Sequence, residues 1–461
     1  MMTMQCTRRG LMAAGASAAG LAFLQPVRAR AATARYPDSR ALAAMIAPSL
    51  KALGPFARVE RLSESSGGRP IDLIAIGRGA RSALIVGAPH PNEPIGCLTI
   101  VRLIERLAID RAFRERSDFT WYFIPAIDPD GLDMNAGWFS GPLTLDRYFR
   151  YFFRPAFSAQ PEYGFPLEMA GYRFNAATPE NFCWQRAIEL ARPQLQSSLH
   201  GNDSGGTFFL LSANRPALAA ALSRLPAEAG IALNDLGEPD SELEHLAPGV
   251  FSFFEVEPWL RKRQQAGESP ADNWSAGRSS AEFAAERFGT LSVTCEVPLW
   301  LDPRQKMPGP SGLDLDDVLR MQLAQAEENL RLLDSAAPAI EASASTREAE
   351  ALALALREAA ATLPGQKREI EAQLKDQRGQ TPVSLIDLVQ LEPGTTAMRA
   401  PAMLARLARL ERRGAIARRA ESLLRTRIDA FQAATTLAPI PTDLTTGLQI
   451  RSVMTALASL G

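Results

Sequence analysis

The chain has 461 residues, of which 46% are hydrophobic and 22% are charged. Its 50 basic and 51 acidic residues nearly cancel, which excludes the strong positive charge that nucleic-acid-binding proteins use, so we expect no nucleic-acid partner. Four cysteines in this length exclude a fold built on disulfides, and the length itself predicts about two or three domains.

Residues 1–31 have the order of an export signal. Thr7-Arg-Arg-Gly-Leu-Met12 is typical of a twin-arginine head, a short apolar stretch rich in alanine and glycine follows, and Ala29-Arg-Ala31 matches a cleavage site. The apolar stretch is too short to span a membrane. We therefore expect an exported, periplasmic protein with no transmembrane segment once the signal has been removed.

Residues 36–335 alternate between two hydrophobic periods, one typical of helices and one typical of buried strands. The predicted strands are 58–62, 71–76, 83–86, 119–124, 195–199, 207–211 and 291–297. The predicted helices are 42–53, 95–108, 180–191 and 214–224. Apolar strands that alternate with helices predict an α/β fold, in which a mixed, twisted sheet is covered by helices on both faces.

A polar pair, His90 and Glu93, directly follows the predicted strand 83–86. Open α/β sheets place their ligands at such strand ends. An imidazole and a carboxylate three residues apart can bind one metal ion, and catalytic zinc commonly takes two histidines and one glutamate. The alternative for such a pair is a loop histidine beside a glutamate that begins a helix.

The chain has two other histidines, and they differ in setting. His200 ends the predicted strand 195–199 and precedes a glycine-rich loop, so its side chain also projects from a strand end. His245 follows acidic residues in a polar stretch, which is typical of an ordinary surface histidine. His200 is therefore the better candidate for a second imidazole ligand.

With these residues the chain resembles the zinc metallocarboxypeptidase family, whose ligands are an HxxE pair and a later histidine. The stretch Trp121-Tyr-Phe-Ile-Pro-Ala-Ile-Asp-Pro-Asp-Gly131 is similar to the family's Asn-Pro-Asp-Gly turn, with Asp128 in place of the asparagine. A late strand, Leu291-Ser-Val-Thr-Cys-Glu-Val-Pro-Leu-Trp300, places Glu296 where the family has its general base. The order of these motifs along the chain matches the order in the family.

The resemblance implies a zinc carboxypeptidase-like sheet with one Zn²⁺ held by His90, Glu93 and His200. It also implies cleavage of a C-terminal peptide bond by metal-activated water, with Glu296 as the general base. Each role suits its residue type, because a carboxylate can shuttle a proton whereas a permanently charged arginine can only hold charge.

In this family an arginine downstream of the Pro-Asp-Gly turn stabilises the oxyanion, and an aromatic, arginine-rich insertion follows the turn here. Its candidates are Arg147, Arg150 and Arg154, of which we favour Arg150. A guanidinium suits this role because it is always charged and presents several donors. The alternative is that these arginines lie on a solvated helix face and that the neighbouring aromatic residues are core.

The family also binds the terminal carboxylate of its substrate with an Asn-Arg pair, and here the chain departs from the pattern. Gly171-Tyr-Arg-Phe-Asn-Ala176 matches the asparagine with Asn175 but has alanine at the arginine position. Arg173 and Arg147 are the candidates for a displaced cation. No tyrosine follows Tyr172, so the late tyrosine that many members close over the substrate is absent.

These departures leave three functions open. The first is a peptidase, and the second is an amidase or deacylase that acts on N-acyl amino acids or on cell-wall peptides. The third is a zinc-binding protein whose catalysis has lapsed. The bound molecule would be a peptide or an acyl amino acid in the first two cases.

Residues 336–461 change in composition to alanine, leucine, arginine and glutamate, which predicts an all-helical extension. The predicted helices are 345–363, 367–377, 403–410 and 415–431, and a helix over 313–333 can still pack on the first domain. Residues 399–427 hold nine arginines against two acidic residues. Such a stretch favours contact with an anionic surface, such as lipid or wall polymer, or it forms the solvated side of a helical bundle.

Overall fold

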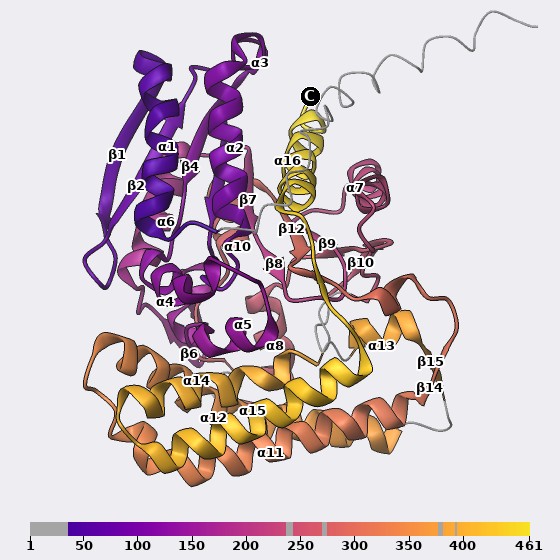
Figure 1. Ribbon diagram of the computed structural model, residues 1–461. Coiled ribbons are helices and arrows are strands. Elements are labelled where there is room, and N and C mark those ends of the chain that lie inside the picture. The colour runs from indigo at the N-terminus through magenta and orange to yellow at the C-terminus, as the bar shows by residue number, and fades with distance from the viewer. Residues whose placement is uncertain (1–35, 237–242, 270–273, 377–380, 392–393) are drawn as a thin grey trace, which may run out of the picture.

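The computed structural model describes residues 36–236, 243–269, 274–376, 381–391 and 394–461 (Figure 1). The signal predicted over residues 1–31 lies outside the described residues, so it stays a prediction. Among the residues that the structure describes, no helix is long and apolar enough to cross a membrane.

A 10-stranded mixed sheet forms the centre of the first part of the chain, in the order β1-β2-β4-β3-β7-β12-β9-β11-β10, with β8 paired to β12. The strands β3, β7 and β12 are neighbours in this order and run parallel to one another. All of the predicted strands are present. The bounds are β1 Ala57–Glu64, β2 Pro70–Ile76, β3 Arg81–Gly87, β4 Phe119–Ile124, β7 Leu195–Leu199, β8 Gly201–Asn202, β9 Phe208–Leu211, β10 His245–Ala247, β11 Val250–Ser252 and β12 Leu291–Pro298.

Helices cover both faces of this sheet, because the side chains of its inner strands alternate between two hydrophobic clusters. Along β3, Ala83 and Ile85 enter the larger cluster, whereas Leu84 and Val86 enter a second one on the opposite face. The first cluster includes residues of α1 Ser39–Leu53, α2 Ile95–Ile109, α7 Pro216–Ala229 and α16 Thr442–Ala458. The second includes residues of α6 Pro179–Ala191 and α10 Ser280–Phe288. The predicted α/β class is confirmed.

Shorter elements connect the strands of the sheet and its long helices. The helices are α3 Arg111–Arg116, α4 Pro129–Phe139, α5 Leu145–Tyr151 and α8 Val256–Gln265. The 3₁₀ turns are η2 Gly54–Phe56, η3 Phe157–Ala159, η4 Pro161–Tyr163 and η5 Pro303–Lys306. A small hairpin pairs β5 Leu167–Met169 with β6 Tyr172–Phe174. The arginine-rich insertion therefore consists of short helices and turns, and the Thr144 hydroxyl caps its first helix, α5.

Four further helices lie side by side across the lower part of Figure 1, in orange to yellow. They are α11 Leu315–Glu341, α12 Arg347–Asp376, α14 Arg399–Leu410 and α15 Gly414–Ala434, and the short α13 Leu385–Leu391 and η6 Thr396–Met398 connect them. Two small two-stranded sheets accompany them, β13 Trp300–Leu301 with β16 Ala438–Pro439, and β14 Pro310–Asp314 with β15 Pro382–Ser384. The helical character predicted for this part is confirmed.

Two predicted boundaries in this region are wrong. The break placed between residues 335 and 336 falls inside α11, because buried residues continue through Ala336, Ala339 and Ile340 to the end of that helix. The helices predicted over 345–363 and 367–377 are one helix, α12, which continues through Pro364. Both helices keep their hydrophobic period across the predicted breaks, and the polar residues at these breaks do not end a helix.

The last helix does not belong to the helical extension in space. In Figure 1, α16 returns to the sheet and lies beside α2, in the same layer. Its buried side chains, such as Leu448 and Val453, share the large hydrophobic cluster with the strands. Residues 336–461 therefore complete the α/β part of the molecule as well as forming helices outside it.

Most of the arginines of 399–427 bind other parts of the chain. Five of them form ion pairs: Arg399 with Asp203, Arg406 with Glu348, Arg409 with Glu421, Arg425 with Asp146 and Arg427 with Glu328. Arg412, Arg418 and Arg419 are exposed. Contact with an anionic surface stays a prediction that concerns these exposed arginines.

Candidate active site

The predicted site residues meet at the carboxyl ends of three neighbouring parallel strands. His90 follows β3, His200 follows β7, and Glu296 lies near the end of β12. The carboxyl ends of parallel strands lie at one edge of a sheet, which is why residues so far apart in sequence converge. Glu93 lies in the turn before α2, where its N–H donates to the carbonyl of His90.

All four side chains are buried, with at most 6% of each residue exposed. Glu93 lies between the two imidazoles, with 3.1 Å from His90 Nδ1 to Oε1 and 3.1 Å from His200 Nδ1 to Oε2. Glu296 Oε1 lies 3.6 Å from His200 Nδ1. The structure therefore brings together all of the residues that the sequence analysis assigned to metal binding and to proton transfer.

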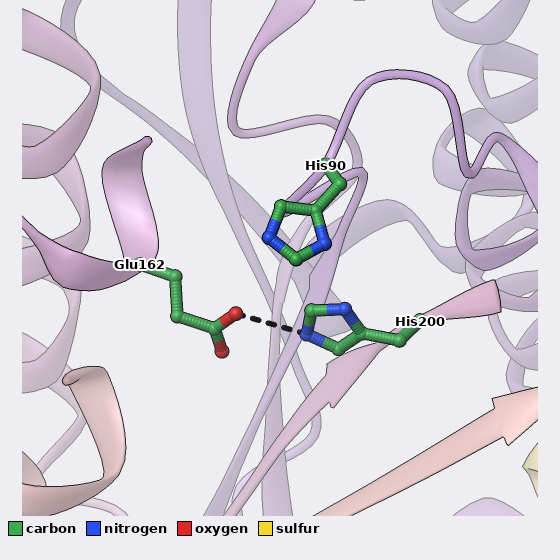
Figure 2. Close-up of side chains that lie close together, drawn as sticks. All are labelled: His90, Glu162 and His200. Carbon is green, nitrogen blue, oxygen red and sulfur yellow. Dashed lines mark ion pairs between the residues drawn. The ribbon is translucent and has the colours of Figure 1, made fainter. Parts of the chain in front are cut away.

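A fifth residue of the site, Glu162, was missed by the sequence analysis. It lies in the turn η4 and is buried, and its Oε2 lies 3.0 Å from His200 Nε2 (Figure 2). The two nitrogens of His200 therefore face different carboxylates, Nδ1 towards Glu93 and Nε2 towards Glu162. A lone glutamate in an aromatic insertion has no spacing that marks it, so the sequence carries no usable signal.

The arginine that reaches this cluster is Arg154 and not the favoured Arg150. Arg154 Nη1 donates to Glu93 Oε1 at 2.7 Å, and Nη2 lies 3.0 Å from His90 Nδ1. Arg150 is exposed on α5, where its guanidinium lies over the ring of Tyr151. Arg147 lies on the same short helix and is half-buried. Because α5 ends at Tyr151, helical spacing does not determine the direction of Arg154.

Two of the three residues predicted to bind the substrate's carboxylate, Arg173 and Asn175, do not belong to the buried cluster. Arg173 lies on β6 and Asn175 directly follows it, and both are exposed. His245, predicted to be a surface histidine, is also exposed and lies 2.8 Å from Asp235. Cys97, Cys183 and Cys295 are free and buried, which agrees with a fold that is not built on disulfides.

The site concentrates negative charge in a buried place. Three carboxylates, Glu93, Glu162 and Glu296, face one guanidinium, that of Arg154, which leaves two negative charges when both imidazoles are neutral. An isolated buried carboxylate is costly unless it is paired or binds a metal. A proton on His200 can neutralise part of this charge, and a divalent cation can neutralise all of it.

The pKa values of the site follow from this arrangement. Burial lowers the pKa of His200, but the carboxylates of Glu162, Glu93 and Glu296 outweigh it and hold that pKa well above its usual value. Burial and the neighbouring Arg154 lower the pKa of His90. Burial raises the pKa of Glu93, but His90 and Arg154 outweigh it and hold that pKa well below its usual value.

The donor atoms present fit a divalent metal. Two sets of three residues, His90 with Glu162 and His200, and Glu93 with His200 and Glu296, each offer ligand atoms within 4.8 Å of one another. Imidazole nitrogens and carboxylate oxygens are the ligands that zinc takes in catalytic sites. The chemistry of the donor set and its net charge therefore both agree with a Zn²⁺ site.

Residues behind the site hold its backbone in place. Gln449 of α16 is fully buried, and its amide donates to the carbonyls of His200 at 2.7 Å and of Cys295 at 3.3 Å. These carbonyls belong to a predicted ligand and to the neighbour of Glu296. The last helix of the chain therefore binds the backbone of the site, which the sequence analysis did not predict.

The Asp-Pro-Asp-Gly turn packs against the loop that carries His90. Asp128 caps α4, and its side chain accepts from the N–H of Gly131. A side-chain carbon at Gly131 would lie 2.6 Å from Pro91, the residue next to His90, so glycine is required for this close approach. Burial raises the pKa of Asp128 to about 7. This turn fixes the loop without touching the metal-binding atoms.

Comparisons with known proteins agree with the motifs in one part of the chain. The model of the zinc carboxypeptidase family matches residues 49–142. Among solved structures, a metallo-carboxypeptidase from Burkholderia cenocepacia is 18% identical with a TM-score of 0.35, over 57% of this chain and 60% of that one. Carboxypeptidase A from Helicoverpa armigera is 16% identical with a TM-score of 0.40, over 61% of this chain and 69% of that one.

The chain thus spans about 60% of the length of the Burkholderia cenocepacia protein. No curated protein matches it. The family match covers the first two predicted ligands, while His200 and Glu296 lie beyond it and are placed beside them by the fold. Residues 49–142, which include His90 and Glu93, are thus similar to the zinc carboxypeptidase family.

Proposed function

We propose that this protein is a zinc-dependent hydrolase that cleaves an amide bond of a peptide or peptide-like substrate. The observation that carries the proposal is the convergence of His90, Glu93, His200 and Glu296 in one buried group at the end of three parallel strands. The family match over residues 49–142 supports the same chemistry.

His90, Glu93 and His200 would hold the zinc. When bound, zinc lowers the pKa of a water molecule towards about 7 and polarises a substrate carbonyl. Because Nε2 of His200 faces Glu162, Nδ1 is the nitrogen left for the metal. Glu162 would accept the Nε2–H, which fixes the tautomer and orientation of the ring and makes His200 a stronger ligand.

Two further residues act on the substrate in this proposal. Glu296 takes a proton from the attacking water and returns it to the leaving amine, as its carboxylate lies within the same buried group. Arg154 holds the negative charge that develops on the carbonyl oxygen, which replaces the role first assigned to Arg150. A guanidinium beside Glu93 suits this role because it stays charged at every working pH.

A second candidate is an amidase or deacylase whose substrate has no free carboxylate next to the cleaved bond. The specific observation is that Arg173 and Asn175 are exposed, while the extra buried carboxylate of Glu162 disfavours an anionic group nearby. A wall peptide cleaved at an internal amide fits this description, whereas an N-acyl amino acid keeps a free carboxylate beside its amide bond. The sequence of residues 1–31 supports a proposal of export to the periplasm, where wall peptides occur.

The test is zinc content measured together with hydrolysis of a mixed panel of peptides, peptide amides and acyl amino acids. We expect about one zinc per chain. Glu296→Gln should retain the zinc and lose turnover by ~10³-fold, because general acid–base catalysis contributes roughly that much. The same substitution at the exposed Glu105 is the matched control.

Three outcomes of this test separate the candidates. Preference for peptides with a free C-terminal carboxylate favours the carboxypeptidase, and preference for their amides favours the amidase. Bound zinc without turnover on any substrate favours a binding protein. Full activity of Glu296→Gln would remove Glu296 as the base.

A further inference from the structure

The segment that carries Arg154 lacks a regular element of its own. The helix α5 ends at Tyr151, and residues 152–156 lead to the turn η3 without helix or strand. On one side Asn135 of α4 binds this segment, since its amide donates to the carbonyl of Phe153 and its oxygen accepts from the Phe153 N–H. The position of Arg154 therefore depends on side chains from other elements.

On the other side, Arg406 of α14 binds the end of α5. Its Nη1 donates to the carbonyls of Tyr151 at 2.7 Å and Phe152 at 3.3 Å, and its Nη2 donates to the carbonyl of Met134 at 2.8 Å. The last carbonyls of a helix have no partner within the helix, and a cation there is favourable. Arg406 is buried and pairs with Glu348 of α12, so it is itself held in place.

Glu358 of α12 binds the same segment on the far side of Arg154. Its carboxylate accepts from the N–H of Phe157, and from the N–H and hydroxyl of Ser158 at 3.2 and 2.6 Å. These three donors include the free N–H groups at the start of η3. The turn that leads on to Glu162 is thus fixed by a residue from the helical extension.

A third contact joins the same helices to the loop after His200. Arg399, at the start of α14, lies 3.1 Å from Asp203 Oδ2, while Asp203 Oδ1 accepts from the hydroxyl of Tyr148 at 2.5 Å. Tyr148 is a buried residue of α5. The helices α12 and α14 therefore contact both the segment that carries Arg154 and the loop that follows His200.

We propose that the C-terminal helices α12 and α14 position Arg154 in the active site, with Glu358 and Arg406 as positioning residues. The role of Arg154 in turnover rests on the proposed hydrolase function, whereas the contacts on its segment do not. Neither Glu358 nor Arg406 touches the proposed metal ligands. Their contribution acts through the backbone on the two sides of Arg154.

Glu358→Ala is the variant of choice, because Glu358 is half-buried and its loss leaves no buried cation unpaired. We expect kcat to fall by ~10–100-fold while KM and zinc affinity change by less than about two-fold, as expected from a misplaced transition-state contact. Glu350→Ala, an exposed glutamate on the same helix, is the matched control. Glu358→Gln, which keeps one acceptor oxygen, should recover part of the loss.

A double-substitution cycle with Arg154→Ala separates positioning from a general loss of structure. If Glu358 acts through Arg154, Glu358→Ala has little further effect on kcat in the Arg154→Ala protein. Effects that add in full, or an unchanged kcat in Glu358→Ala, would overturn the proposal. Hydrogen exchange of residues 146–158 supplies a readout that needs no substrate.

This exchange should increase in Glu358→Ala and stay unchanged in Glu350→Ala, since the N–H groups of Phe157 and Ser158 lose their acceptor. If the wild-type protein hydrolyses nothing, the proposed function fails and the exchange measurement decides the positioning on its own. Unchanged exchange in Glu358→Ala would then overturn it.

Discussion

The residues of the site come from two kinds of structure. His90, Glu93, His200 and Glu296 lie at or just beyond the ends of sheet strands, whereas Arg154 and Glu162 lie in an insertion of short helices and turns. The first group lies on strands of the sheet or in the loops that directly follow them, and the amide of Gln449 also binds the backbone at His200 and Cys295. The second group is positioned by side chains of the C-terminal helices, which bind the insertion from outside.

The two groups of side chains therefore differ in what determines their positions. A strand end has a direction that the sheet determines, so its side chains stay in place when distant residues change. The insertion depends on a few long-range hydrogen bonds, each of which contributes roughly 1 kcal/mol. We therefore expect the catalytic contacts of the insertion to be more sensitive to substitutions far from the site.

The sharpest way to test this comparison is to replace Arg154 and Arg150 in turn by alanine. Arg154→Ala should lower kcat by ~10²–10³-fold, the usual cost of losing one donor to an oxyanion. Arg150→Ala should change kcat by less than about two-fold, because its guanidinium is exposed on α5. Steady-state kinetics on the best substrate of the panel measures both.

These two variants can contradict the structure directly. A large loss in Arg150→Ala with none in Arg154→Ala would restore the assignment made from the sequence. It would also mean that the catalytic arginine lies on α5.

The turn behind the strand-end group gives a prediction about stability. Burial raises the pKa of Asp128 from 3.8 to about 7, so between these values the folded protein holds a proton that the unfolded chain releases. Stability therefore falls as pH rises through this window, by up to about 4 kcal/mol. Asp128→Asn keeps an acceptor for the Gly131 N–H and has no charge to bury, so it should be more stable than the wild type at pH 8.

Chemical denaturation of both proteins between pH 5 and about 8 measures this difference. Asp429→Asn, at an exposed aspartate, is the control for the general effect of removing a carboxylate. An equal pH dependence in Asp128→Asn and the wild type would show that Asp128 is charged in the folded protein.

Glu162 tests whether the insertion contributes to metal binding. Glu162→Gln retains an oxygen that can accept from His200 Nε2 but loses the negative charge. We expect zinc affinity to fall by ~10–100-fold, the usual effect of altering a partner of a ligating histidine. Competition with a chelator measures the affinity, and Glu105→Gln serves as the control.

The size of this effect decides the role of Glu162. A larger loss of zinc affinity, with a changed absorption spectrum of the cobalt-substituted protein, would make Glu162 a direct ligand. Unchanged affinity would mean that the carboxylate beside His200 has no part in metal binding.

The strand-end group could be predicted from the sequence, and the insertion could not. The sequence predicts the positions of His90 and His200 because each directly follows an apolar run that reads as a strand. The strand and the side chain that projects from its end are therefore adjacent in the chain. The direction of Arg154 is set by partners such as Glu358, 201 residues from Phe157, and Arg406, 255 residues from Tyr151. No local pattern in the sequence indicates such contacts, so the sequence predicts neither the direction of Arg154 nor the position of Glu162.

The same reason explains the misplaced domain boundary. A change in composition near residue 336 suggested a separate extension, but α11 continues across it and α16 packs beside α2. Gln449 shows the consequence, since one amide from the last helix binds the backbone at His200 and next to Glu296. The composition of a segment predicts its secondary structure but not the surface against which it packs.

The smallest expected effect concerns the hairpin β5–β6, where the sequence analysis placed a carboxylate-binding cation. Arg173 is exposed there, so Arg173→Ala should change kcat/KM by less than about two-fold on peptides and on their amides alike. Parallel assays of one peptide with a free carboxylate and with an amide end measure the ratio. A selective loss on the free carboxylate would mean that the hairpin closes over the substrate, and a part of the insertion's surface would then belong to the binding site.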